Sequence, residues 1–199
     1  MSKTRNRWRV AAVVVMGSLV TAGTVTAASA EGPRPEFQLP FECGQKWQLN
    51  SYDSTHAPAL DMVREPQADT EGSLVIAPAD GVVKQSFDAS APGKDAGNVI
   101  QIDHGDGWFT TYLHLQSRSV QGGESVSQGQ EIGRVGHTGE TANGVPHLHF
   151  EQGVDSNGDG NATWGEQGSE RVESVFNGVK YGTTGETWRN VTSNNNCGS

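Results

Sequence analysis

The sequence has little positive charge, and only two of its 199 residues are cysteines. Fourteen lysines and arginines stand against 23 aspartates and glutamates, which gives a formal net charge of −9. A chain this acidic is not expected to bind the phosphate backbone of a nucleic acid. Its one long apolar run, residues 10–25, is rich in Gly, Ser and Thr and falls short of a good membrane span of about 20 residues. These absences exclude a nucleic-acid partner and argue against a stable membrane anchor.

Residues 1–30 have the layout of a secretory signal peptide. A basic start precedes the apolar run, and Ala28-Ser29-Ala30 offers a small-x-small cleavage site. A retained membrane anchor is the alternative. Cleavage removes four positive charges and no acidic one, so the formal charge of the remaining 169 residues moves from −9 to −13. The pattern predicts an exported, extracellular protein.

The two cysteines lie near the ends of the exported chain, at Cys43 and Cys197. In an oxidising compartment this placement favours a disulfide that ties the two ends together. Two free thiols are the alternative, which export disfavours.

The exported chain has no internal repeat and no low-complexity tract. Residues 31–41 contain three prolines and predict an extended lead-in, so we expect one domain over residues 42–199. No segment carries a sustained helical period. Short β-type runs separated by turn residues predict an all-β, mostly antiparallel sheet domain with long connecting loops. The predicted strands are 73–77, 81–87, 98–104, 108–115, 130–136 and 146–152, with a hairpin turn at 105–107.

Two of the six histidines, His147 and His149, flank a single leucine. Side chains alternate between the faces of a strand, so both imidazoles are expected on one face and the leucine on the other. The same rule is expected to place Tyr112 and His114 on one face of residues 108–115, with Tyr112 a candidate contact to substrate. Two strands would thus offer imidazoles to one site.

A third contribution comes from upstream, where His56 precedes Asp61. Imidazole and carboxylate are common ligands of Zn²⁺, and a catalytic zinc site takes three protein ligands and leaves one position open. Such a site lowers the pKa of bound water and polarises a carbonyl.

Several segments in this order resemble the lysostaphin-like zinc metalloendopeptidases, which cut the peptides of peptidoglycan. They are the His-to-Asp pair, APADGVVKQS, NVIQIDHGDGWFTTYLHL, GQEIGRVGHTG and PHLHFE, within about residues 50–152. The resemblance implies that His56, Asp61 and His149 bind zinc, and that His114 and His147 are catalytic. One of the two would orient or deprotonate the attacking water, and the other would donate to the oxyanion or the leaving amine; their roles stay open.

The spacing of the first two ligands departs from the family pattern. The family most often has three residues between the histidine and the aspartate, whereas four residues separate His56 from Asp61. A bulge or wider turn, eased by Pro58, would absorb the extra residue. Otherwise one of the two would miss the metal and the site would be inactive.

The resemblance implies a secreted, cell-wall-associated zinc metalloendopeptidase that hydrolyses cross-bridge or stem peptides by a zinc-activated water. Peptidoglycan peptides are the expected partner, and a monomer is expected. A catalytically inactive member that binds peptidoglycan or activates another hydrolase is the alternative. A biotinyl or lipoyl carrier is disfavoured, because no modifiable lysine lies between Lys94 and Lys180.

Residues 155–166, DSNGDGNATWGE, fit the calcium-loop pattern D-x-[DN]-x-[DN]-G-x₅-E without a mismatch. Such a loop would add a structural Ca²⁺ beside zinc; a flexible polar turn is the alternative. The candidate oxygen ligands are Asp155, Asn157, Asp159, the Asn161 carbonyl, Thr163 and Glu166.

Overall fold

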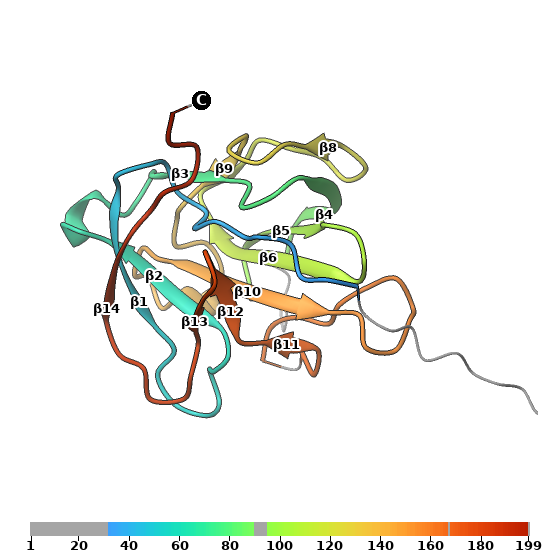
Figure 1. The fold of residues 1–199 in the computed structure, drawn as a ribbon. Coiled ribbons are helices and arrows are strands. Elements are labelled where there is room, and N and C mark those ends of the chain that lie inside the picture. Colours follow the sequence, from blue (N-terminus) through green and yellow to red (C-terminus); the bar gives the residue numbers. More distant parts are fainter. Residues whose placement is uncertain (1–31, 90–94, 167, 199) are drawn as a thin grey trace, which may run out of the picture.

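The computed structural model describes residues 32–89, 95–166 and 168–198 (Figure 1). Its regular structure is antiparallel β-strand apart from two short 3-10 helices in these ranges, so the predicted all-β fold class is confirmed. Neither helix is long and apolar enough to cross a membrane. The signal peptide predicted at residues 1–30 lies outside the described residues.

The predicted strands are found within a few residues of their expected bounds, and others were not foreseen. The elements in chain order are β1 (Lys46–Asn50), β2 (Leu60–Arg64), η1 (Gln67–Asp69), β3 (Leu74–Ile76), β4 (Gly81–Asp88), β5 (Asn98–Asp103), β6 (Trp108–Leu115), β7 (Ser117–Arg118), β8 (Ser125–Val126), β9 (Glu131–Arg134), η2 (Glu140–Ala142), β10 (Leu148–Val154), β11 (Arg171–Val172), β12 (Ser174–Phe176), β13 (Val179–Tyr181) and β14 (Arg189–Thr192).

The main sheet runs in the order β14-β1-β2-β10-β6-β5-β4-β8, and β11 pairs with β10 beside this path. Strands β3, β9 and β7 form a second sheet, and β12 pairs with β13. Figure 1 shows β10 lying between β2 and β6, two strands that are distant from it in the sequence. This order brings three distant segments side by side at the centre of the sheet.

The main core lies on one face of the large sheet. Ile100 and Phe150 of that sheet share it with Val75 and Ile132 of the three-stranded sheet, and all four are buried. The lead-in joins the same core: Phe37, Leu39 and Phe41 are buried in it. Residues 32–39 form no regular element and bends follow at Pro40 and Phe41, and the three apolar side chains pack in the same core as residues 42 onward.

The opposite face of the large sheet carries a second, smaller apolar cluster. Val99 and Leu113 are buried there, with Phe87 and Trp164 partly buried against them. Because this face is not covered by the three-stranded sheet, it is open to form a pocket.

A disulfide joins Cys43 and Cys197, whose Cα atoms lie 5.1 Å apart, and this confirms the predicted pairing. Strand β14, which precedes Cys197, also pairs with β1 beside Cys43. Covalent and hydrogen-bonded links therefore hold the two ends of the domain together.

Candidate active site

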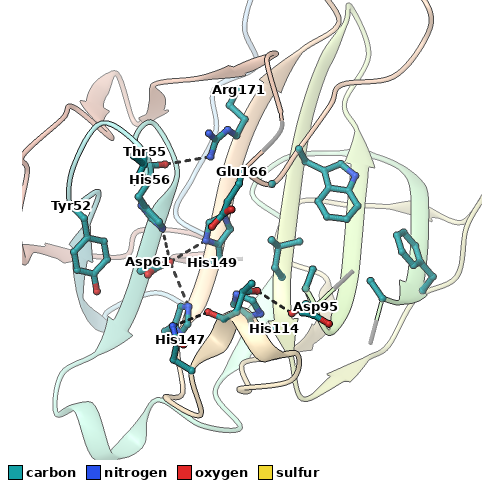
Figure 2. A pocket seen from close by; sticks show the side chains of 18 residues that line it. Tyr52, Thr55, His56, Asp61, Asp95, His114, His147, His149, Glu166 and Arg171 are labelled. Atoms are coloured by element: carbon teal, nitrogen blue, oxygen red, sulfur yellow. Dashed lines mark hydrogen bonds and ion pairs between the residues drawn. The ribbon is translucent and has the colours of Figure 1, made fainter. Parts of the chain in front are cut away.

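Strands β2 and β10 bring Asp61 and His149 face to face. The two residues are direct partners in the antiparallel register, and Asp61 Oδ1 lies 3.1 Å from His149 Nδ1. His147 lines the same pocket and its Nε2 is 3.5 Å from the same oxygen (Figure 2). Leu148 and Phe150 are buried in the main core. The pairing of β2 with β10 thus assembles the polar centre of the site.

His56 reaches this centre from the loop before β2. Its Nε2 lies 3.1 Å from Asp61 Oδ1, and its Nδ1 lies 3.2 Å from the carbonyl oxygen of Ser51. The carbonyl can only accept, so Nδ1 carries a hydrogen and Nε2 faces the site. Residues 54–58 form a turn, the Ala59 N–H donates to the His56 carbonyl, and β2 begins at Leu60, so the chain returns to the site within the four intervening residues. The longer spacing therefore does not separate the two side chains.

Ligand atoms of His56, Asp61 and His149 all lie within 4.8 Å of one another, and no other such cluster was found in the described ranges. Burial opposes ionisation of Asp61, but hydrogen bonds from His149 and His56 outweigh it and lower the pKa of Asp61 far below its usual range. Burial likewise opposes protonation of His149, but bonds to Asp61 and Glu151 raise its pKa to about 9. The site therefore stabilises positive charge, as a cation site must.

His114 reaches the pocket through an irregularity that strand alternation did not anticipate. Between the pairs Asn98↔Leu115 and Ile100↔Tyr112, β6 has one more residue than β5, and His114 has a left-handed backbone with φ of 64°. Such a bulge changes which face the following side chains occupy. His114 and Leu113 both line the pocket.

The prediction that Tyr112 shares the face of His114 is wrong. Tyr112 is fully buried in the main core, where it packs on Phe150, and its hydroxyl lies 2.8 Å from Thr110 Oγ1. The bulge at His114 is the physical reason, because it breaks the two-residue period between these positions. Tyr112 is therefore no contact to substrate.

His114 and His147 lie beside each other, with ring centroids 5.0 Å apart. Each is held by a backbone carbonyl: His114 Nδ1 by Thr138 at 3.0 Å and His147 Nδ1 by Val145 at 2.8 Å. Both rings therefore turn Nε2 away from these carbonyls. Burial, reinforced by the nearby His149 and His147, lowers the pKa of His114 to about 3, so this ring is neutral near pH 7.

The pocket around these side chains has a volume of about 770 Å³, within the usual range for ligand sites. Its two sides differ in chemistry. Polar lining residues include His56, Asp61, His114, His147 and His149, and apolar lining residues include Phe87, Ala89, Leu113 and Trp164. Figure 2 shows Asp95 and Glu166 also among the lining side chains. The site can thus hold a chain with a polar backbone and an apolar side group.

Two residues near the site were missed in the sequence. Glu151 is 2% exposed, and its Oε1 lies 2.9 Å from His149 Nε2. Arg171 lies 3.7 Å from the same oxygen and donates to the carbonyl of His56 at 3.3 Å. The signal for Glu151 was present, because it follows His149 by two residues and so shares its face. Arg171 carried no local signal.

The proposed calcium loop is organised by its own backbone. The Asp155 carboxylate accepts from the N–H groups of Gly158, Asp159 and Gly160, at 2.7 to 3.1 Å. Asn157 and Asp159 accept similarly from residues two further on.

The residue that closes the loop at its end differs from the predicted one. Glu170 accepts from the Thr163 N–H at 2.9 Å, whereas Glu166 lines the histidine pocket. Calcium binding stays a prediction, which calorimetry and melting of the metal-stripped protein with Ca²⁺ would test.

Comparison with known proteins gives a consistent match. The model of peptidase family M23 matches residues 67–160, a range that contains His114, His147 and His149 and begins after Asp61. The peptidoglycan DD-endopeptidase ShyC of Vibrio cholerae is 44% identical over 80 residues, which are 40% of this chain and 17% of the relative. The peptidoglycan DD-endopeptidase ShyA of the same organism is 35% identical over 117 residues, 56% of this chain and 26% of the relative.

The chain therefore spans about a quarter or less of the length of these two relatives. Among solved structures, the catalytic domain of lysostaphin from Staphylococcus simulans is similar with a TM-score of 0.45 and 23% identity. That match covers 67% of this chain and 84% of the other. Residues 67–160 of the chain are thus similar to peptidase family M23.

Proposed function

We propose that this protein is a zinc metalloendopeptidase that hydrolyses peptide bonds in bacterial peptidoglycan. One observation carries the proposal: a His-Asp-His cluster and two further histidines converge in one pocket. The names of the two relatives support peptidoglycan as the substrate class.

The donor set fits zinc. His56, Asp61 and His149 would hold the ion, and two nitrogens with one carboxylate oxygen are a common ligand set of catalytic zinc. The hydrogen bond from His56 Nδ1 to the Ser51 carbonyl supports this reading, because it leaves Nε2 for a metal. When bound, zinc supplies Lewis acidity that polarises a carbonyl and lowers the pKa of water.

The two other histidines suit proton handling. His114 is neutral near pH 7, and its Nδ1–H is committed to Thr138, so Nε2 is a proton acceptor. That arrangement suits the orientation and deprotonation of an attacking water. His147 Nε2 lies 3.5 Å from Asp61 Oδ1 and faces the polar centre. Its Nδ1–H is held by the Val145 carbonyl, so Nε2 would donate to a developing oxyanion or to the leaving amine once the ring has taken up a second proton.

The experiment compares wild type with His149→Ala on purified cell walls, with the released fragments identified by mass spectrometry. Wild type is expected to release peptide fragments, and H149A to release almost none. Metal analysis of both proteins gives an independent readout, since only wild type is expected to retain zinc. Equal release by both proteins would overturn hydrolysis through a zinc site that contains His149. No release by zinc-loaded wild type would instead favour an inactive peptidoglycan-binding protein.

We further propose that residues 1–30 are removed on export, and that residues 42–199, with the lead-in packed into their core, act at the cell wall as a single monomeric domain. The basic, apolar and small-residue layout of the start supports export. Sequencing of the mature N-terminus checks the cleavage, with Glu31 expected as the first residue.

A further inference from the structure

We infer that Glu151 is a positioning residue that fixes His149 with Nδ1 toward the metal site. The inference rests on the proposed zinc site, and it concerns which nitrogen of one ligand faces the ion. Glu151 is on β10, two residues after His149, and strand alternation turns both side chains to the same face. Its role is carried by three sets of contacts.

The first set concerns the ring of His149, which lies between two carboxylates. Its Nδ1 is 3.1 Å from Asp61 Oδ1, and its Nε2 is 2.9 Å from Glu151 Oε1. An ionised carboxylate only accepts hydrogen bonds. When a cation binds one ring nitrogen, the other nitrogen must carry the hydrogen. The carboxylate that accepts this hydrogen then fixes the tautomer and the plane of the ring.

The second set identifies the nitrogen that faces the metal. Asp61 Oδ1 is approached by His56 Nε2 at 3.1 Å as well as by His149 Nδ1. All three potential ligands therefore meet on the Nδ1 side of the ring. Glu151 lies on the other side and is not part of the cluster of potential ligands in the described residues. The geometry points to Nδ1 as the ligand atom and Nε2–H as the donor to Glu151.

The third set shows that Glu151 is itself held in place. The N–H of Gly165 lies 3.0 and 3.1 Å from its two carboxylate oxygens, and the guanidinium of Arg171 lies 3.7 Å from Oε1. With these partners the carboxylate is fixed and its buried charge is compensated. A fixed acceptor can hold an imidazole plane, which a freely rotating one cannot do.

Gly165 lies between Trp164 and Glu166, two residues that line the pocket. The same carboxylate therefore anchors the wall of the pocket and the ring of the proposed ligand. Figure 2 shows Glu166 and His149 among the side chains that line this pocket. Loss of Glu151 is expected to loosen both the ring of His149 and the backbone at Gly165, because both donate charge-assisted hydrogen bonds to this carboxylate.

The test measures zinc affinity by competition with a chelator in purified wild type, E151A, E151Q and E124Q. Glu124 is exposed in the turn before β8 and serves as the matched control. Loss of an outer carboxylate partner is expected to weaken zinc binding by about 10- to 100-fold in E151A. E151Q keeps the shape and a neutral acceptor, so a smaller loss of about 10-fold is expected. E124Q is expected to match wild type.

A second readout separates positioning from general stability. In zinc-loaded wild type, proton NMR is expected to show the Nε2–H of His149 protected from exchange with water, and this protection is expected to fall in E151A and E151Q. Thermal unfolding checks that each variant is folded. If E151A is not folded, the comparison of E151Q with wild type tests the inference. Wild-type zinc affinity with a protected Nε2–H in E151Q would overturn the inference. Wild type that binds no zinc would instead overturn the proposed function.

Discussion

Leu113 and His114 are consecutive residues of β6, yet both side chains line the same pocket. The left-handed backbone of His114, with φ of 64°, turns its imidazole to the face that Leu113 already occupies. A non-glycine residue in this conformation is uncommon and is found often at functional sites. The bulge is therefore what brings a histidine of β6 beside His147.

His114→Asn tests the role of this histidine without disturbing the bulge. Asparagine tolerates the left-handed region better than most residues, so the variant is expected to unfold with nearly the free energy of wild type. Removal of a general acid or base is expected to lower kcat by about 10²- to 10⁴-fold with little change in KM. Chromatography of peptides released from defined wall fragments measures both constants. A kcat equal to that of wild type would exclude His114 from proton transfer.

The sequence was sufficient for the parts of the site that follow regular alternation. His149 is on β10, and His147 directly precedes that strand in an isolated antiparallel bridge to Gly136, so the extended backbone turns both side chains into the same pocket. The same rule gave the wrong face for Tyr112. One extra residue in β6 shifts the alternation of side chains between the two faces, and the sequence pattern does not reveal this bulge. The alternation rule could have predicted the face of Glu151. The position of Arg171 depends instead on the pairing of β11 with β10, which is a long-range contact.

Trp164→Ala tests the apolar side of the pocket. Trp164 is partly buried against Phe87, with ring centroids 6.1 Å apart, and it lines the pocket. Loss of this surface is expected to cost about 1–2 kcal/mol of substrate binding, so KM is expected to rise by about 5- to 30-fold. Trp164→Phe keeps an aromatic ring and is expected to recover most of the affinity. Steady-state kinetics on the same cell-wall peptides measure KM. An unchanged KM in both variants would show that substrate does not contact the apolar side of the pocket.

Removal of the disulfide is expected to destabilise the fold without affecting the site directly. The Cys43–Cys197 bond closes a loop with a sequence separation of 154 residues. The chain-entropy argument gives an upper figure of about 5 kcal/mol for a loop of this length. The double variant C43S/C197S is therefore expected to unfold at clearly lower urea concentration, and zinc affinity measured well below that concentration is expected to be unchanged. Coincident unfolding curves for variant and wild type would contradict a stabilising bond.

His104 is expected to make stability depend on pH between pH 6.5 and pH 4. Its Nδ1–H donates to the Asp80 carbonyl at 2.7 Å, and its Nε2 lies 2.7 Å from Thr110 Oγ1. Burial, only partly offset by the Asp80 carbonyl and nearby carboxylates, lowers the pKa of His104 from 6.5 to about 4. In this window the unfolded chain binds a proton that the folded protein does not, so stability falls as pH falls.

The matched variant for this effect is His104→Gln, which does not titrate. The stabilisation that His104 contributes is complete above pH 6.5, declines through the window and is gone below pH 4. At 1.36 kcal/mol for each unit of pKa, the loss is at most about 3 kcal/mol. Urea unfolding of both proteins from pH 4 to pH 8 measures the difference, in which other titrating groups cancel. A difference that stays constant over this range would show that His104 has the same pKa in the folded and unfolded states.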